Sequence, residues 1–410
     1  MATPISLCLF LSLILLFASV LVQSVVPKDK TFHFINQGKF DDGKEDAPYA
    51  IGYRHVGVSS YPFGLYLYTI GLRKANKLVL GISGGDPTKE GFSQFMSWVW
   101  MANRNDPAGE NSTLTFGSDG NLVLANFDGR IVWQTNTADR GVTGISMQPN
   151  GNLVLHDGKG RFVWQSFDYP TDGILSGQTL KHSRTKKLVS RAEYSETRDG
   201  SESIVIGKNG FIMYLNNSGK PLQGYAGWEA KGLHSVKFDS VQEFDPAIVT
   251  YFITLGFANE QQAQNSTSMP SLPPVRDQAT RWTRTLPDPP QPKTPIPEPK
   301  LALPKVRPLQ RRIVLARVYF EDTEFMGVKA NLSYAYLRLD PGGNLRIYTL
   351  FAYPNNKNWW QETYAFFLDT VEECAFRSKC CSGFSKCGAL SLPLCPSDCP
   401  SCASGCIIKT

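Results

Sequence analysis

The sequence has 410 residues, 42% of them hydrophobic, with 42 Lys and Arg against 36 Asp and Glu and a net charge of +6. Nine basic and three acidic residues between residues 270 and 312 account for this whole excess, so the rest of the chain is neutral. A charge confined to one segment does not support nucleic-acid binding. It favours a solvated linker or contact with an anionic polysaccharide.

The first 24 residues have the pattern of a secretory signal peptide. Residues 5–22 are almost continuously apolar and uncharged, and Val22-Gln-Ser24 provides a cleavage point. An uncleaved membrane anchor is the alternative, because no Lys or Arg precedes the apolar run. No second apolar run of this length follows, so we expect a soluble protein outside the cell.

A nucleophile elbow is the first catalytic pattern in chain order. Gly81-Ile-Ser-Gly-Gly85 matches it, but the elbow needs a strand-to-helix turn in an α/β sheet, and here more β pattern follows. The acid pairs Asp168 with Asp172 and Glu321-Asp322 with Glu324 could serve glycosidase chemistry, although turn capping and solvation are simpler roles. The five histidines lack metal-ligand spacing: His33, His55, His156, His182 and His234. We therefore expect no enzyme activity, no cofactor and no metal.

An internal repeat is the main structural signal. Asp119-Gly-Asn-Leu-Val-Leu124 recurs as Asn150-Gly-Asn-Leu-Val-Leu155, and Gly129-Arg-Ile-Val-Trp-Gln134 recurs at the same offset as Gly160-Arg-Phe-Val-Trp-Gln165. A third Val-Trp pair, at residues 99–100, lies close to one repeat length before Trp133. The repeat therefore indicates three related units.

Each unit predicts short antiparallel strands. Polar and apolar residues alternate, and Asp-Gly or Asn-Gly marks the turns. One such unit cannot bury its apolar face alone. We predict an all-β fold in which three units form a three-fold β-prism, with Trp100, Trp133 and Trp164 at its centre.

Twelve prolines between residues 270 and 308 interrupt this pattern. Proline fixes φ and lacks a backbone donor, so the stretch predicts an extended, polyproline-like linker or insertion. Apolar, patterned sequence on both sides predicts folded β-units around it.

The cysteines and sequons fit an oxidising compartment. One cysteine, Cys8, lies in the signal, and the other eight predict a disulfide framework whose connectivity stays open. They are Cys374, Cys380, Cys381, Cys387, Cys395, Cys399, Cys402 and Cys406. A zinc site is the alternative, given the Cys399 to Cys402 spacing, but no histidine follows His234. Four sequons are candidate N-glycosylation sites: Asn111, Asn216, Asn265 and Asn331.

Three jointly specific motifs carry a family resemblance. They are Trp98-Val-Trp-Met-Ala-Asn-Arg-Asn-Asp-Pro107, Asp119-Gly-Asn-Leu-Val-Leu124 and Val163-Trp-Gln-Ser-Phe-Asp-Tyr-Pro-Thr-Asp172. Together they resemble the bulb-type, mannose-binding lectin domain of plant S-locus glycoproteins. Leu339-Asp-Pro-Gly-Gly-Asn-Leu-Arg-Ile-Tyr348 resembles that family's second β-domain, and the cysteines from Cys374 resemble its EGF-like or PAN-like module. Without a kinase, the chain is similar to the epidermis-specific secreted glycoproteins.

The resemblance implies a degenerate carbohydrate site. The family's mannose pocket has the pattern Q-x-D-x-N-x-V-x-Y, five side chains on one face of a strand. The second unit offers Gln148, Asn150, Asn152, Val154 and His156, with Asn150 for the acid and His156 for the tyrosine. The first unit offers Asp119, Asn121 and Val123, with Gly117 and Ala125 at the ends. Neither pocket is complete, so we expect mannose binding to be weak or absent.

The resemblance also divides the chain into domains. We expect a signal peptide at 1–24, a bulb-type lectin β-prism at 45–172, a second β-domain at 173–268 and 313–370, a Pro-rich basic linker or insertion at 269–312, and a disulfide-rich EGF-like or PAN-like module at 371–410. The expected function is that of a secreted, non-catalytic extracellular or cell-wall glycoprotein with a lectin-type scaffold for protein or weak glycan contacts. A functional mannose-binding lectin is the alternative. Mannose-type glycans, anionic wall polysaccharide and extracellular proteins are the expected partners, without nucleic acid or a membrane span after signal cleavage.

Overall fold

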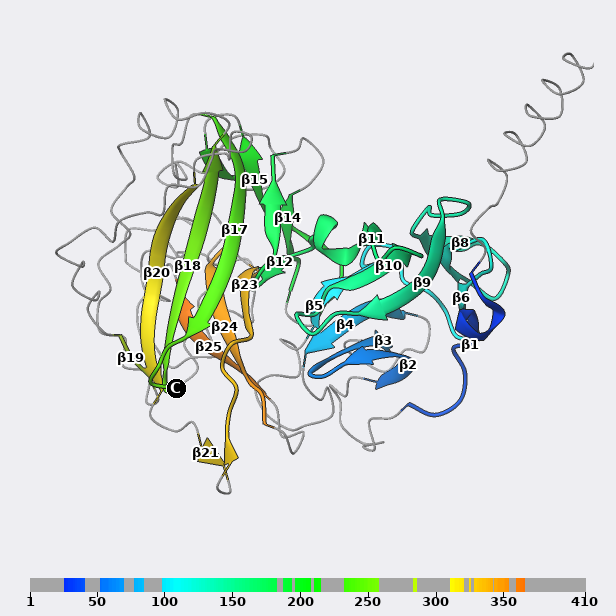
Figure 1. Ribbon diagram of the computed structural model, residues 1–410. Coiled ribbons are helices and arrows are strands. Elements are labelled where there is room, and N and C mark those ends of the chain that lie inside the picture. Colours follow the sequence, from blue (N-terminus) through cyan, green and yellow to red (C-terminus); the bar gives the residue numbers. More distant parts are fainter. Residues whose placement is uncertain are drawn as a thin grey trace, which may run out of the picture. The chain divides into compact units, whose positions relative to one another are not determined.

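The computed structural model describes residues 26–40, 52–69, 77–84, 98–182, 187–193, 196–207, 210–214, 232–257, 283–285, 310–320, 324–325, 328–341, 343–353 and 359–365. Over these ranges the protein consists of strands and two short 3₁₀ helices, η1 (Lys28–Lys30) and η2 (Ser166–Asp168), which confirms the predicted all-β class (Figure 1). The predicted signal peptide, Asn216, Asn265 and the nine cysteines lie outside the described residues. No helix of the described part is long and apolar enough to cross a membrane.

The chain divides into two compact units. The first is formed by Met1–Leu80 and Asp106–Asp168, and the second by Gly81–Asn105 and Tyr169–Thr410. This division runs through the predicted lectin region, because the segment 81–105 belongs with the C-terminal strands.

Two antiparallel sheets of the first unit contain the sequence repeat. One has the order β1 (Phe32–Ile35), β6 (Thr113–Phe116), β7 (Leu122–Ala125), β8 (Ile131–Gln134). The other has the order β11 (Phe162–Gln165), β10 (Leu153–Asp157), β9 (Val142–Met147). A four-stranded sheet runs in the order β2 (Gly52–Ser60), β3 (Phe63–Thr69), β4 (Val79–Gly84), β5 (Trp98–Met101), and the boundary between the units falls within β4.

The predicted alternation produces these strands. In β6 and β7 the side chains of Leu114, Phe116, Leu122 and Leu124 are fully buried, while the residues between them are half-buried on the opposite face. Each repeat hairpin closes with a glycine at positive φ, which L side chains rarely adopt, Gly129 at 83° being the first. The antiparallel hairpins β7–β8 and β10–β11 therefore occur where the repeat predicted them.

The repeat tryptophans meet across the two sheets of the first unit. Trp133 of β8 and Trp164 of β11 pack edge to face, with ring centroids 5.8 Å apart at an interplanar angle of 74°. Trp100 lies in β5 of the second unit, where its indole N–H donates to the backbone oxygen of Tyr169 over 2.8 Å.

Strand β1 precedes the region in which the sequence predicted the lectin domain. Phe32 to Ile35 pair with β6 and complete its sheet. The chain after β1 is held by Arg54, which is 5% exposed and donates to the Asn36 carboxamide oxygen and to Glu110, at 2.7 Å for its closer oxygen. The backbone N–H of Val26 donates to Ser118 O at 3.0 Å. Strand β1 is too short to show a hydrophobic period, so the sequence did not predict it.

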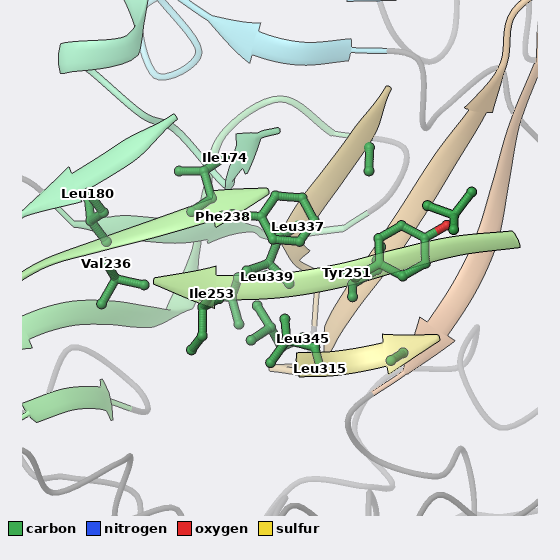
Figure 2. Packing of buried hydrophobic residues seen from close by; sticks show 14 of the residues in the cluster. Ile174, Leu180, Val236, Phe238, Tyr251, Ile253, Leu315, Leu337, Leu339 and Leu345 are labelled. Carbon is green, nitrogen blue, oxygen red and sulfur yellow. The ribbon is translucent and has the colours of Figure 1, made fainter. Parts of the chain in front are cut away.

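The second unit has two large sheets around one hydrophobic cluster. The first sheet has the order β13 (Thr179–Lys181), β17 (Leu233–Gln242), β18 (Ile248–Phe257), β20 (Gln310–Phe320), β19 (Thr283–Thr285), and its long strands β17, β18 and β20 lie side by side (Figure 1). The second has the order β12 (Gly173–Leu175), β23 (Ala335–Leu339), β24 (Leu345–Phe351), β25 (Trp359–Ala365). Phe238, Tyr251 and Ile253 of the first sheet join Leu337, Leu339 and Leu345 of the second in the cluster (Figure 2).

Smaller sheets complete the described strands. One has the order β14 (Leu188–Arg191), β15 (Asp199–Gly207), β16 (Gly210–Tyr214), and the other consists of β21 (Glu324–Phe325) and β22 (Val328–Lys329).

Strand β20 brings together the segments that flank the Pro-rich region. Gly256, at the end of β18, is the register partner of Gln310, at the start of β20. Strand β19, from within the Pro-rich region, pairs with the far end of β20, where Thr283 lies opposite Phe320. The strands that precede and follow residues 258–309, β18 and β20, are therefore neighbours in the same sheet.

The sheet containing β23 and β24 is buried on both faces. Away from the hydrophobic cluster, Trp360 of β25 is 3% exposed and its indole N–H donates to the backbone oxygen of Gly84 in β4 over 2.8 Å. The second unit thus joins strands that are 276 residues apart in sequence.

We predict that Trp360→Phe lowers the free energy of unfolding by about 1–3 kcal/mol, because the buried carbonyl of Gly84 loses its donor. Urea unfolding followed by circular dichroism measures the change. Tyr169→Phe, at a side chain that is 51% exposed, is the control and should change stability by less than about 0.5 kcal/mol. Equal effects of the two substitutions would contradict the contact.

Candidate carbohydrate site

The five residues predicted to bind sugar in the second repeat begin in the turn between β9 and β10. The N–H of Gly151 donates to Gln148 O at 2.9 Å, and the N–H of Gln148 donates to Asn152 O at 2.8 Å. The carboxamide oxygen of exposed Asn150 accepts from the N–H of Asn152 at 3.2 Å, an Asx turn. Asn150 therefore shapes this turn.

Asn152 is occupied by contacts inside the protein. Its side-chain nitrogen donates to Gln165 Oε1 at 2.8 Å. Its oxygen accepts from the hydroxyl of Ser166 and the N–H of Phe167, both at 3.2 Å. Because the residue is only 4% exposed, the carboxamide joins the start of β10 to the end of β11 and presents almost no surface to a ligand.

The remaining three residues differ in access. Val154 is fully buried, so its side chain cannot cover the apolar face of a sugar. Half-buried Gln148 donates from Nε2 to the hydroxyl of Ser146 at 3.1 Å. The ring of half-buried His156 lies over Gly144, where a Cβ would come within 2.7 Å of its Cε1 atom. Three of the five predicted residues therefore retain some exposure: Gln148, Asn150 and His156.

The first repeat contains the same arrangement. Asn121, 7% exposed, donates to Gln134 Oε1 at 2.9 Å and accepts from the hydroxyl of Thr135 at 3.0 Å and the N–H of Thr137 at 3.1 Å. The carboxylate of Asp119 accepts from the N–H of Asn121 at 3.0 Å. Val123 is half-buried in β7.

We call this arrangement the carboxamide clamp: an Asn before one strand is bound to the Gln that ends the next strand and to the Thr or Ser that follows this Gln. Each hydroxyl also accepts from the strand, from the N–H of Leu122 in the first repeat and of Leu153 in the second, both at 3.0 Å. These Gln, Thr and Ser partners were not predicted from the sequence, although Gln134-Thr135 recurs as Gln165-Ser166 at the offset of the repeat. The repeat's polar signature is thus explained by hydrogen bonding within each hairpin.

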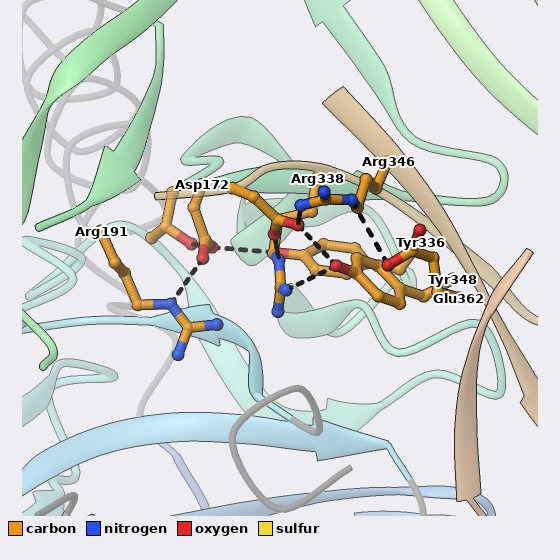
Figure 3. Close-up of polar contacts among 9 residues, drawn as sticks. Asp172, Arg191, Tyr336, Arg338, Arg346, Tyr348 and Glu362 are labelled. Carbon is orange, nitrogen blue, oxygen red and sulfur yellow. Dashed lines mark hydrogen bonds and ion pairs between the residues drawn. The ribbon is translucent and has the colours of Figure 1, made fainter. Parts of the chain in front are cut away.

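Asp172, considered above as a catalytic acid, lies in a buried network (Figure 3). It is 1% exposed, forms an ion pair with Arg191 Nε at 2.9 Å, and accepts from the Tyr336 hydroxyl at 2.8 Å. The interpretation as a turn-capping residue is therefore wrong, because Asp172, directly before β12, is buried on the face of β23 that carries Tyr336. Burial alone would raise the pKa of this carboxyl, but the guanidinium groups of Arg191, Arg104 and Arg338 hold the pKa below its ordinary value.

The same face holds a second buried carboxylate. Asp340 forms ion pairs with Arg338 and with Arg346, the latter at 2.9 Å, and accepts from the Tyr348 hydroxyl at 2.5 Å. Burial again opposes ionisation, and the two arginines outweigh it, so the pKa of Asp340 is also lowered. Carboxylates that stay ionised and paired in this way cannot act as general acids at neutral pH.

The candidate nucleophile Ser83 and a metal site lack the geometry that such sites need. Ser83 lies within strand β4 and is fully buried, not at an exposed strand-to-helix turn. Among the described residues, no group of three or more His, Cys, Asp or Glu could hold a metal ion.

Two predicted glycosylation sites are described. Asn111 is exposed in the loop before β6, with a φ of 60°. Asn331 is exposed, and its carboxamide oxygen accepts from the N–H and hydroxyl of Ser333, at 2.9 and 2.6 Å. Both carboxamides are therefore at the surface, as a sequon requires.

Comparison with known proteins gives two kinds of match. Residues 97–193 match the D-mannose binding lectin family. EP1-like glycoprotein 2 of Arabidopsis thaliana is 37% identical over 368 residues, covering 88% of this chain and 70% of the relative. EP1-like glycoprotein 4 of the same plant is 33% identical over 404 residues, covering 97% and 76%. The epidermis-specific secreted glycoprotein EP1 of Daucus carota is 44% identical over 206 residues, covering 50% and 51%.

We predict that Asn152→Ala destabilises the protein by about 2–3 kcal/mol, because the carboxamide clamp loses its central residue and leaves buried groups unsatisfied. Asn150→Ala, which removes one hydrogen bond at an exposed side chain, should cost at most about 1 kcal/mol. Thermal unfolding of both variants measures the difference. Equal stabilities, with mannose binding lost only in Asn152→Ala, would assign Asn152 to sugar binding.

The buried carboxylates predict a loss of stability in acid. Their folded pKa values lie below the unfolded value of about 3.9, so the unfolded chain binds more protons as the pH falls. The stability that they contribute should be complete above about pH 5 and decline below about pH 4, by up to about 1.4 kcal/mol per pH unit for each carboxyl. Urea unfolding between pH 7 and pH 3 measures this decline.

The matched variant for the acid experiment is Asp172→Asn combined with Arg191→Met, which removes the ion pair without leaving a buried charge. Its unfolding free energy should fall less between pH 5 and pH 3 than that of the unmodified protein. An identical decline would show that Asp172 does not contribute to acid sensitivity.

Proposed function

Because the chain belongs to the EP1-like glycoprotein family, we propose that it is a secreted extracellular or cell-wall glycoprotein whose lectin-type β scaffold makes protein or weak glycan contacts without catalysis. The relative from Daucus carota is itself named a secreted glycoprotein. The predicted signal peptide and the surface positions of Asn111 and Asn331 support the same compartment.

The observation that carries the scaffold role is the carboxamide clamp. The Asn that would hydrogen-bond a sugar hydroxyl is 7% exposed in the first repeat and 4% exposed in the second, and each is bonded to groups of its own hairpin. Binding a sugar there would break these bonds, and each buried group left unpaired costs about 1–3 kcal/mol. A shallow sugar site offers few contacts to offset that loss.

A functional mannose-binding lectin is the second candidate. The match of residues 97–193 to the D-mannose binding lectin family favours it, together with the exposure remaining at Gln148, Asn150 and His156. The full burial of Val154 and the two substitutions in the pocket pattern weigh against it.

Three observations support the absence of catalysis. Ser83 is enclosed in a strand, and both Asp172 and Asp340 are buried and ionised in pairs with arginine. A glycosidase needs one carboxylic acid with a raised pKa facing the substrate, and the environment of these two carboxylates lowers it.

The domain organisation is part of the proposal. The edge-to-face contact of Trp133 with Trp164 supports the packing of two of the three units of the proposed β-prism, whereas Trp100 belongs to the other compact unit. The pairing of Gly256 with Gln310 supports an insertion within the second β-domain at residues 269–312, whose basic residues remain candidates for anionic wall polysaccharide. The C-terminal disulfide-rich module is proposed from the cysteine spacing alone.

We predict that the secreted, glycosylated protein shows no measurable mannose binding by calorimetry and no mannose signal on a glycan array. The combined change Asn150→Asp and His156→Tyr, which completes the family pattern, should add little affinity because Asn152 and Val154 stay buried. Gln148→Ala is the control at an accessible position. Tight mannose binding that Gln148→Ala removes would establish the lectin alternative.

A further inference from the structure

The sheet β1-β6-β7-β8 exposes a row of apolar side chains. Ile35 lies opposite Thr113, Thr113 opposite Ala125, and Ala125 opposite Ile131, so one residue from each strand occupies the same row. Residues directly opposite each other across antiparallel strands share a face. With strands about 4.8 Å apart, the row is roughly 14 Å wide.

The ends of this row are unusually open. Ile35 is 44% exposed and Ile131 is 51% exposed, while Thr113 and Ala125 between them are half-buried. Phe127, in the turn that follows Ala125, is 77% exposed. Single exposed apolar residues are normal on proteins, but three large ones along one row and its adjoining turn form a surface that favours association. We call Ile35, Ala125, Phe127 and Ile131 the apolar row.

The arginine of the hairpin that carries Phe127 and Ile131 is paired with a carboxylate. Arg130, in the same hairpin, binds both carboxylate oxygens of Asp106, at 2.6 and 3.1 Å. Because this pair is neutral as a whole, it adds little electrostatic repulsion against a second apolar surface.

A sequon lies at the border of the apolar row. The N–H of Asn111 donates to Asn36 O at 2.8 Å, and Asn36 directly follows Ile35. In the same loop, the N–H of Gly109 donates to Asn126 Oδ1 at 3.0 Å, and Asn126 directly precedes Phe127. Hydrogen bonds therefore fix the loop of Asn111 beside both Ile35 and Phe127.

The sequon itself leads into the row. In Asn111-Ser112-Thr113, the asparagine is exposed, and Thr113 is the residue of β6 that lies between Ile35 and Ala125. A glycan on Asn111 would therefore begin beside the strand β6 position that lies next to Ile35.

We propose that an N-linked glycan on Asn111 packs over the apolar row and prevents self-association through this sheet face. The carboxamide nitrogen of Asn111 forms the bond to the anomeric carbon of a lipid-linked oligosaccharide, loses a proton, and displaces the lipid diphosphate. The apolar faces of the first sugars then remove the side chains of the row from water, while their hydroxyls stay solvated. This inference rests on the proposed extracellular function, because the glycan is added on the secretory route.

The test compares Asn111→Asp with Asn331→Asp in protein secreted from plant cells. Aspartate tolerates the left-handed φ of 60° at Asn111 better than most residues, so the backbone should be retained. Loss of the Asn111 glycan should cause later elution from a hydrophobic-interaction column and a shift to larger mass in size-exclusion chromatography with light scattering. Loss of the Asn331 glycan should cause neither.

A rescue variant identifies the surface. Adding Ile35→Thr, Phe127→Thr and Ile131→Thr to Asn111→Asp keeps β-branched side chains in the strands and replaces all three large apolar side chains of the row by polar ones. These changes should restore the elution and mass of the unmodified protein. Association that persists in the rescue variant would overturn the proposal, because the row would not be the contact.

Poor accumulation of Asn111→Asp would call for a test on folded protein. A variant with Asn216→Asp, Asn265→Asp and Asn331→Asp keeps Asn111 as its only sequon. Enzymatic removal of its glycan after secretion should produce the same later elution and larger mass, and unchanged behaviour would overturn the proposal.

Mass spectrometry of the unmodified protein decides occupancy. An Asn111 peptide without glycan would also overturn this inference, whereas the amount of protein in the extracellular fluid tests the proposed function separately.

Discussion

The carboxamide clamp is the interaction on which the first unit depends. A hairpin of such short strands has few ladder hydrogen bonds, and its turn contains polar groups that must be satisfied once the hairpin is packed. Asn121 and Asn152 satisfy them by joining the turn before one strand to the residues after the next. Both hairpins are thereby fixed in register, with Leu122 and Leu124 or Leu153 and Leu155 turned inward.

The clamp also limits what the lectin-type surface can bind. A polar residue in a strand can serve the fold or a ligand, and burial decides between the two. Asn152 is enclosed and fully engaged, while Gln148, Asn150 and His156 keep exposure but lack the acid and the tyrosine of the mannose pattern. The buried carboxamides therefore serve the fold, and under the proposed function the exposed surface of the scaffold makes the contacts with partners.

The second unit is stabilised differently, because one of its sheets buries charged side chains. Its sheet β12-β23-β24-β25 packs one face on the hydrophobic cluster and buries charged side chains on the other. Asp172 and Asp340 can remain there only because arginines and tyrosine hydroxyls surround them. This polar face, together with the contact of Trp360 with Gly84, brings the segment 81–105 into the same unit as the C-terminal strands.

The sequence by itself determined the all-β class, the repeat hairpins, the family and the compartment, because period-two alternation, Gly turns and the signal pattern are local properties of the chain. Three features were decided only by the tertiary structure. Strand β1 is too short to show a hydrophobic period. The sequence around Asp172 predicts a turn residue, and only the packing of the second unit shows that its side chain is buried. The sequence pattern predicts Asn152 as a sugar-binding residue, whereas the structure shows its carboxamide hydrogen-bonded to Gln165 and Ser166. Whether a polar side chain faces water or its own fold depends on partners that sequence spacing alone does not place.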